Sequence, residues 1–478
     1  MQPLLLIIKK EIKTALREHL IVSLGAIILI LLGVALYAGY VSYQQQQKII
    51  AETQSEKRAE WLGQGDKHPH IAAHYGTFAF KPKTVLSLFD FGLDAYTGTS
   101  VYLEAHYQHE FLFRPAQDHS SMIRFGELSA ALVLQLLLPL LIIFLTFSSF
   151  TREREGGTLK LLLGQGLSFR TLSWGKVLAY NIILATLLCP LLVGMLFFSG
   201  AGDQYDVIPD VSGRILLICL LYGLYAWLAV AISVWVSRRA SSGRNALLTL
   251  LTCWIFFTLL MPKTLTNISA SLYPLPPMRI FKAGIQDDIS NGLDGQTPRS
   301  VRMARLEKEY LERYAVDSVQ QLPFNFEGVQ MQAGEVYGDE VYDHHLARLH
   351  EIFHRQNRLS SIASLINPFL AVKHLSMALA GTDLYTFIHF EKAAENYRRS
   401  LVRRMNEDMA EHSQYGEFYG YQAGSDLWQE IEDFSYQGPT VEELLRHYKL
   451  EISSLLIWVT AITILLNFYP AKAGSIHG

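Results

Sequence analysis

The sequence predicts an all-α membrane protein, with six transmembrane helices and two large segments outside the bilayer. Half of its 478 residues are hydrophobic and only 18% are charged, below the roughly 25% that is usual for soluble domains. The mean hydropathy of +0.17 is nevertheless too low for a chain that lies wholly within a membrane. The net charge of −3 offers no basic excess for nucleic acid, and 12% aromatic residues argue against disorder.

Six apolar stretches approach the length of about 20 residues that a helix needs to cross the hydrocarbon core. The predicted spans are 20–43, 128–150, 177–200, 214–237, 245–262 and 451–470. Buried core helices seldom reach this length without charge. The first stretch exceeds a signal-peptide core and lacks a cleavage site, so we expect an uncleaved anchor. Three cysteines lie in apolar runs and predict no disulfide or metal site: Cys189, Cys219 and Cys253.

Lysine and arginine are distributed asymmetrically among the connecting segments. Basic residues lie before the first span, between the second and third spans, and between the fourth and fifth. They are Lys9, Lys10, Lys13 and Arg17; Arg152, Arg154, Lys160, Arg170 and Lys176; and Arg238, Arg239 and Arg244. The loop between the third and fourth spans instead carries Asp203, Asp206 and Asp210. Because cytoplasmic loops collect positive charge, we expect both termini to be cytoplasmic in a bacterial inner membrane. Segments 44–126 and 263–450 are then periplasmic.

The N-terminal segment 1–19 is amphipathic. One helical face carries apolar side chains and a neighbouring stripe is basic; the apolar residues are Leu5, Ile8, Ile12 and Leu16, and the basic ones are Lys9, Lys13 and Arg17. This pattern predicts a helix in the headgroup plane that leads into the first span. The alternative is an ordinary basic flank that only sets topology.

The segment 151–176 between the second and third spans predicts a docking element. Alternating charges break at Gly156-Gly157, and a short apolar helix follows over Thr158–Leu163. Gly164 and Gly166 are expected to end this helix, and Ser168 can cap the next one. A short helix across the mouth of a bundle suits the binding of a soluble partner.

The run from Arg154 to Leu163, followed by Gly175-Lys176, resembles the coupling loop of exporter-type (type two) ABC transporter permeases. A proline usually follows the leucines in that family, where Gly164-Gln165-Gly166 stands here. The resemblance implies that a separate ATPase docks on 151–176. The residues that it places in the coupling contact are Arg152, Glu153, Arg154, Glu155, Gly156, Thr158, Leu159, Leu162 and Gly164.

Further stretches resemble an uncharacterised bacterial branch of these permeases that carries two large periplasmic insertions. They are Ala72–Gly76, Phe80–Lys83, Tyr96–Gly98, Leu103–His106, Arg124–Gly126, Asn367–Ala371, Leu375–Asp383 and Met405–Met409. The resemblance implies a permease that pairs with a second copy or a paralogue in the lipid bilayer. It does not name a cargo.

The chain carries no phosphate-binding loop of its own. The nearest fragment is Gly175-Lys176, with Arg170 in place of the first glycine and Val177 in place of the hydroxyl residue. Without these groups Mg-nucleotide cannot be held. We therefore expect no catalytic residue and no directly bound cofactor, and ATP and Mg enter through the partner subunit.

The segment 263–450 is predicted to be helical. Apolar stripes at helical spacing run through it: Met303, Leu306, Tyr310 and Tyr314; Tyr342, Leu346, Leu349 and Phe353; Phe390, Ala394, Tyr397, Leu401 and Met405. Gly381 suits a helix end, and Thr382 or Asp383 can cap the next helix. Glycine, proline and short aromatic runs predict a smaller, mixed fold for 44–126.

Two histidine patterns could bind metal. His350 and His354 fit the His-Glu-x-x-His template of zinc hydrolases, with Glu351 as base and either Glu391 or Glu395 as third ligand. His68, His70 and His74 form the second pattern. A periplasmic metal-binding or hydrolytic protein therefore remains an alternative to the permease. A scaffold that transmits force without transport is another alternative. The helix that carries His350 and His354 can also be an ordinary solvated helix.

Overall fold

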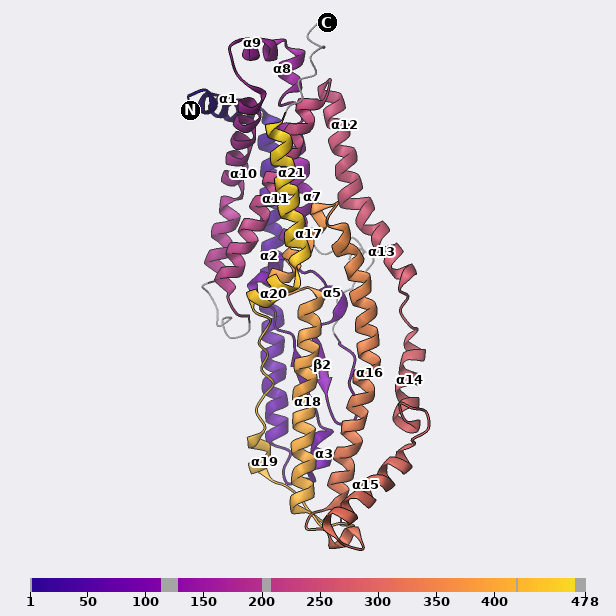
Figure 1. Cartoon of the computed structure of the whole chain (residues 1–478). Coiled ribbons are helices and arrows are strands. Elements are labelled where there is room, and N and C mark those ends of the chain that lie inside the picture. The colour runs from indigo at the N-terminus through magenta and orange to yellow at the C-terminus, as the bar shows by residue number, and fades with distance from the viewer. Residues whose placement is uncertain (1, 113–127, 200–207, 418–419, 469–478) are drawn as a thin grey trace.

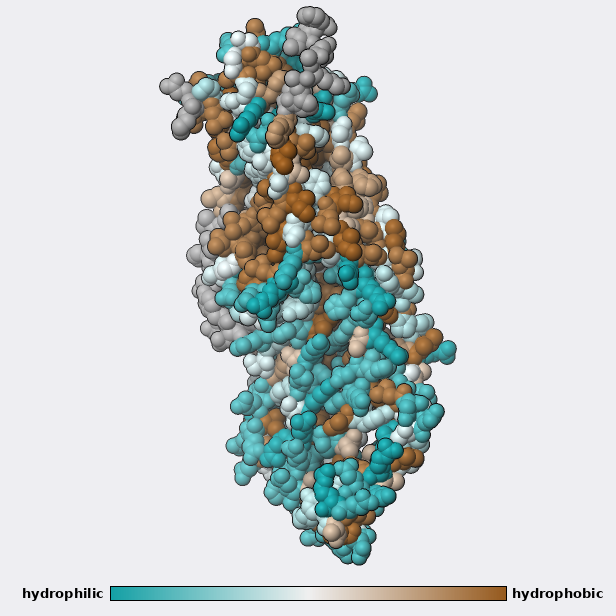
Figure 2. Space-filling model, viewed as in Figure 1, coloured by the Kyte–Doolittle hydropathy of each residue, from teal (hydrophilic) through white to brown (hydrophobic). Residues whose placement is uncertain are grey.

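A computed structural model describes residues 2–112, 128–199, 208–417 and 420–468. The molecule is elongated, with an apolar half and a polar half along its long axis (Figure 2). We call the polar half, built from the second part of α2, the segment 63–112 and most of 273–447, the polar domain. The predicted acidic residues Asp203 and Asp206 lie outside the described residues, as do Arg124–Gly126.

Six helices in the described part of the chain are long and apolar enough to cross a membrane. They are α2 (His19–Leu62), α7 (Ala130–Thr146), α10 (Phe169–Ser199), α11 (Val211–Arg239), the continuous helix α12–η3–α13 (Gly243–Trp254, Ile255–Leu260, Met261–Leu272) and α21 (Lys449–Asn467). This confirms the prediction of an all-α membrane protein with six spans. The central helix α11 contacts α7, α10, α12 and α21, so it forms the core of the bundle.

Helix α2 does not end at the predicted boundary near residue 43. It continues without a break to Leu62, a total of 44 residues. At 1.5 Å per residue this is about 66 Å, twice the hydrocarbon thickness of about 30 Å. The apolar run marks only the part in the membrane, and the polar remainder extends the same helix into the polar domain (Figure 1).

The fifth span is also longer than predicted. The helix begins at Gly243 and continues past Pro262 to Leu272, and a π-helical turn lies over Ile255–Leu260. Proline cannot donate the usual backbone hydrogen bond. Here it stands at the second position of α13, directly after the π turn, so the helix continues through it.

The polar domain is largely helical, in agreement with the expectation for 263–450. Its helices are α14 (Met278–Asn291), α15 (Arg299–Tyr314), α16 (Phe326–Ala363), α18 (Leu384–His412), α19 (Ser425–Glu430) and α20 (Val441–His447). The long helices α16 and α18 lie side by side (Figure 1). Gly381 ends the preceding helix at φ 73°, and Asp383 caps α18 by accepting from the Thr386 backbone N–H.

The segment 63–112 is mixed, as expected. It contains α3 (Pro69–Ala73), α4 (Val85–Phe89), α5 (Asp94–Thr97) and an antiparallel pair of strands, β1 (Thr77–Phe80) and β2 (Ser100–Leu103). The register pairs Thr77 with Leu103 and Phe80 with Ser100. Helix α3 and strand β2 pack against α18, which fixes this segment on the helical framework.

One helix of the second insertion lies among the spans, where the sequence placed it outside. Helix α17 (Pro368–Ala380) contacts α11, α21 and α7. The Asn367 amide donates to the Phe257 carbonyl at 2.7 Å, and Trp458 Nε1 donates to the Leu365 carbonyl at 3.1 Å. Phe257 and Trp458 lie near the middle of their spans. The turn between α16 and α17 therefore re-enters the membrane half, and its 13-residue helix is too short to be recognised as a span.

Candidate functional site

The loop between α7 and α10 forms two short helices at the end of the bundle that also carries α1 (Gln2–Arg17) (Figure 1). They are α8 (Thr151–Glu155) and α9 (Thr158–Gly164). Gly157 and Gly166 flank α9 at φ 72° and 88°, values that favour glycine. The Ser168 hydroxyl accepts from the Thr171 N–H at 3.0 Å and caps α10. The predicted break, helix and cap are thus confirmed.

Helix α9 presents a partly apolar surface away from the bundle. Leu161 is 67% exposed at its centre, whereas Leu159 is buried in the hydrophobic core of the helical bundle. Lys160 is exposed beside Leu161. One side of the helix is thus anchored, and the other combines an apolar and a basic side chain in a form suited to protein contact.

Helix α8 faces inward and is held by a buried ion-pair cluster. Glu153 Oε1 accepts from Lys176 Nζ at 3.0 Å and from Lys10 Nζ at 2.6 Å. Lys176 also donates to Glu11 Oε1 at 2.7 Å, and the Tyr180 hydroxyl donates to Glu11 Oε2 at 3.0 Å. The charges of two carboxylates and two ammonium groups balance in this cluster. Their attraction offsets the free-energy cost of removing the buried charges from water. The cluster joins α1, α8 and α10.

Glu11 and Lys10, the two residues that α1 contributes to this cluster, are held in their charged forms. Burial alone would raise the pKa of Glu11, but Lys176 and Lys10 hold it below its ordinary value. Burial would lower the pKa of Lys10, but hydrogen bonds to Glu11 and Glu153 raise it. The pair therefore remains ionised at neutral pH.

The C-terminal part of α8 is fixed to two further spans. The Arg154 guanidinium donates to the carbonyls of Arg238, at 2.7 Å, and Ala240, at the end of α11. Glu155 Oε1 accepts from the Gly243 N–H at 2.9 Å, at the start of α12. Positive charge at a helix C-terminus and negative charge at an N-terminus both complement the helix dipole. Helix α8 is thus fastened to α1, α10, α11 and α12.

The nine residues predicted for the coupling contact divide by orientation. The outward residues are Arg152, Glu155, Gly156, Thr158 and Gly164, and the buried or half-buried ones are Glu153, Arg154, Leu159 and Leu162. Arg152 donates to Glu18 Oε1 at 2.6 Å. The outward set is available to a partner, and the inward set connects the loop to the bundle.

Sequence reasoning missed the buried face of α1. That face consists of Ile7, Glu11 and Ala15, which lie against α10, whereas Leu5 and Leu16 of the predicted stripe are 60% and 64% exposed. Two of the four residues of the predicted stripe therefore lie exposed, and Ile8 and Ile12 are half-buried. Glu11 is the only acidic residue before Glu18, and this isolated charge was the available signal.

Gly175 allows α1 to approach α10 closely. A Cβ at this position would lie 2.6 Å from Ile7 Cγ2, well inside van der Waals contact. The Gly175-Lys176 pair that resembles the permease family thus has a structural account here. The glycine brings α1 close, and the lysine binds Glu11.

The structure does not assemble the zinc-hydrolase template. His350 Nε2 lies 2.8 Å from Glu391 Oε2, but Glu351 is exposed and pairs with Arg355 at 2.7 Å. The other proposed ligand, Glu395, binds Arg398 and Arg399. Burial and the neighbouring His350 lower the pKa of His354. Among the described residues this region holds no group of three metal-ligating side chains.

The second histidine pattern is brought together in part. His70 and His74 lie beside each other and are joined by His106, which the metal hypothesis did not include. His68 is buried, and burial followed by its neighbour His70 lowers its pKa to about 4.

A large cavity lies where the polar domain meets the spans. Its volume is about 1230 Å³, and its walls come from α13, α14, α16, α17 and the segment 92–112. The lining is mainly apolar with a few charged groups, and it includes Phe281, Lys282, Tyr342, His350, Lys373 and Glu391.

The chain thus forms a six-span helical bundle, with a helical loop fastened to α1, α10, α11 and α12. Residues 106–262 match the family model described as ABC-2 family transporter protein, and residues 280–437 match a domain of unknown function (DUF3526). The chain is also similar to the probable ABC transporter permease protein NosY of Pseudomonas aeruginosa, with 36% identity over 141 residues. This alignment covers 28% of the chain and 48% of that relative, so the chain spans about half the length of the curated relative it matches.

These two transporter matches confirm the resemblance to type-two ABC permeases. The residues 106–262 that match the family model include α7 to α12 and the α8–α9 loop.

Proposed function

We propose that the chain is the membrane-spanning subunit of an ABC exporter, driven by a separate ATPase that docks on 151–176. The observation that supports this proposal is that the two helices of the loop face opposite ways, α9 outward and α8 toward the bundle. Helix α9 presents Leu161 outward, while Glu153 and Arg154 of α8 bind groups on α1, α10 and α11. A partner bound to α9 would therefore move several helices together.

The ionic contacts of α8 give a route for this coupling. A push on α9 passes through the two-residue break at Gly156 and Gly157 to α8. From α8 it reaches α10 through Glu153 and Lys176, and α11 through Arg154. Charge-assisted hydrogen bonds are short and directional, so they transmit displacement better than apolar contacts alone.

The energy source and orientation follow from the sequence. The chain lacks a phosphate-binding loop motif, so ATP and Mg are bound by the separate ATPase. Basic residues at the α8–α9 end support a cytoplasmic location for that end and for both termini, in a bacterial inner membrane. The polar domain is then periplasmic, and a second copy or a paralogue completes the pathway.

The cavity between the polar domain and the spans is our candidate for receiving cargo. Its apolar lining with a few charged groups is typical of sites for amphipathic ligands, and α17, which forms part of the wall, re-enters the membrane half. Movement of the spans would change this wall. The cargo itself is not identified.

A specific observation also favours force transmission without transport. Helix α2 runs unbroken for 44 residues from the bundle into the polar domain, so it could carry motion to a partner bound there. A cysteine label in the cavity, at Phe281, separates the two roles. Labelling of the cysteine at position 281 that depends on ATP supports transport. A structural change that depends on ATP but is confined to the far end of α16 and α18 supports a scaffold.

Copurification from the native host tests the proposed function. We expect a P-loop ATPase to copurify with the full chain and to be lost when 158–166 is replaced by a Gly/Ser linker of equal length. A linker of the same kind replacing 292–298, at the opposite end, is the matched control. Equal ATPase recovery with both variants would overturn the proposed docking site.

A further inference from the structure

Three histidines from two separate parts of the chain converge in the polar domain. His70 lies in α3 and His74 at its end, one helical turn apart, and His106 follows β2. One ring nitrogen of each lies within 4.8 Å of those of the other two. The ring centroids form a nearly equilateral triangle, with sides of 5.1, 5.1 and 4.9 Å.

The backbone of the segment 63–112 builds this triangle. The Ala105 N–H donates to the Ala73 carbonyl at 3.2 Å, which joins the end of α3 to the turn after β2. His106 in that turn has φ 69°, in the left-handed region that side chains other than glycine rarely adopt. Such strain is often found at functional sites, and here it aims the ring at the other two.

Polar side chains outside the triangle orient two of the three rings. Asn406 donates its amide to Gln332 Oε1 at 3.1 Å, so its Oδ1 is the acceptor that lies 3.2 Å from His70 Nδ1. His106 Nδ1 pairs with the buried Glu335 carboxylate. A proton on each Nδ1 leaves the Nε2 lone pair available, which is the usual arrangement of metal-ligating histidines.

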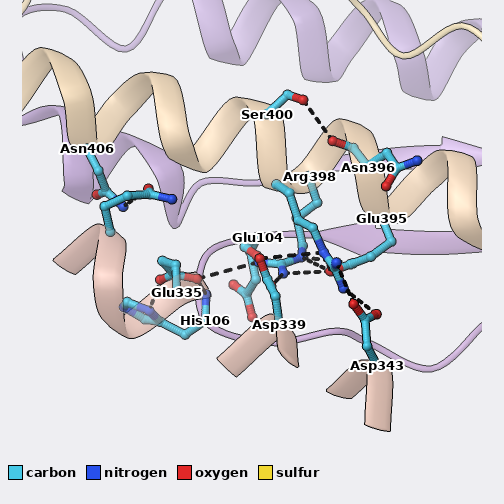
Figure 3. A network of polar contacts seen from close by, with 12 residues as sticks. Glu104, His106, Glu335, Asp339, Asp343, Glu395, Asn396, Arg398, Ser400 and Asn406 are labelled. Atoms are coloured by element: carbon cyan, nitrogen blue, oxygen red, sulfur yellow. Dashed lines mark hydrogen bonds and ion pairs between the residues drawn. The ribbon is translucent and has the colours of Figure 1, made fainter. Parts of the chain in front are cut away.

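The surroundings carry excess negative charge. Arg398 binds Glu335, Asp339 and Glu395 (Figure 3). The neighbouring Arg399 binds Asp339 and Glu395. Arg399 also binds the carboxylate of Asp343 at 2.7 Å. Four carboxylates thus face two guanidinium groups, next to His106. A cation held by the histidines would reduce this imbalance.

We propose that His70, His74 and His106 bind one divalent transition-metal ion such as Zn²⁺ or Cu²⁺. Imidazole nitrogens without thiolates suit these ions, and three protein ligands leave one position for water or an exchanging ligand. His70 is buried while His74 and His106 are exposed, so an ion can enter from solvent. Zn–N bonds of about 2.0–2.1 Å would bring these nitrogens to about 3.4 Å from one another. The inference concerns the polar domain alone and does not depend on ATPase docking.

Metal titration of the full chain tests the site. The protein is purified without a polyhistidine tag, stripped with chelator, and titrated with Zn²⁺ and separately with Cu²⁺ by calorimetry, with elemental analysis of the product. We expect one ion per chain, bound more tightly for Cu²⁺ than for Zn²⁺. Loss of that stoichiometric ion is expected in His74→Ala and in His106→Ala, with unchanged thermal unfolding of metal-free His74→Ala.

Two further variants separate a site from nonspecific binding. Asn406→Leu should weaken metal affinity about 10–100-fold, because it removes the hydrogen bond that orients the His70 ring. His354→Ala, a histidine on α16 outside the cluster, should bind as the unmodified chain does. Electron paramagnetic resonance of the Cu²⁺ form should show three nitrogen ligands. Binding that is absent in the full chain, or unchanged in His74→Ala and His106→Ala, would overturn the proposal.

Discussion

Lys176 of α10 and Glu11 of α1 form a buried ion pair, with Nζ and Oε1 2.7 Å apart, although 165 residues separate them in sequence. Lys176 is fully buried, and it also binds Glu153 of α8 at 3.0 Å. The N-terminal helix is therefore more than a basic flank on the membrane surface. It is fastened to the same lysine that holds the α8–α9 loop.

Lys176→Met should strongly destabilise this end of the bundle, because it leaves the two buried carboxylates with Lys10 as their one remaining cation in this cluster. Removing one member of a buried ion pair typically costs about 3–5 kcal/mol. Thermal unfolding in detergent, followed by tryptophan fluorescence, measures the loss. Lys9→Met, at an exposed position of α1, is the control and should change stability by less than about 0.5 kcal/mol.

The stabilisation by Glu11 should depend on pH with a defined sign. Because the pKa of Glu11 is lowered in the folded state from 4.5, its contribution is present above that pH. It is lost as the pH falls through the lower folded value. The difference in melting temperature between the unmodified chain and Glu11→Gln should thus be constant near neutrality and shrink below pH 4.5. A difference that grows on acidification would contradict this assignment.

Gly175→Ala should push α1 away from α10. The added Cβ would meet Ile7 Cγ2 at 2.6 Å, and a β-branched side chain has little freedom to move. Overpacking of this kind costs about 1–3 kcal/mol. Ile7→Ala in the same chain should recover most of that loss, because it removes the clashing atom. Additive losses in the double variant would show that the two residues are not in contact.

Leu161→Glu should abolish binding of the proposed ATPase without unfolding the chain. Leu161 is 67% exposed on α9, so its replacement removes no core contact. ATPase recovery and thermal unfolding are measured on the same preparation. Val301→Glu, also at an exposed apolar position but in α15 of the polar domain, should leave both unchanged. Loss of the ATPase in both variants would indicate a general defect.

The sequence predicts much of this architecture because its strongest signals are local. Uncharged runs identify the six spans, and Gly157, Gly166 and Ser168 mark the ends of α9 and the start of α10. Each of these depends on neighbouring residues only. Helix α2 was cut short at the bilayer edge because hydropathy reports the solvent around a helix, not its continuation.

The features that were not predicted arise from contacts between distant residues. Glu11 finds Lys176 only after α1 packs on α10, and His106 joins His70 and His74 only after β2 pairs with β1. Helix α17 was assigned to the periplasmic segment 263–450 because a helix of 13 residues is too short for a span. Its place is set by hydrogen bonds to the spans.

Site-specific photo-crosslinking at position 161 in intact cells tests the central claim most directly. A benzophenone amino acid replaces Leu161 on α9, and the matched control carries it at Val301. The account predicts a covalent adduct with a P-loop ATPase from position 161 and not from 301, identified by mass spectrometry. An ATPase adduct from position 301, or none from 161 while the ATPase still copurifies, would contradict docking on this loop.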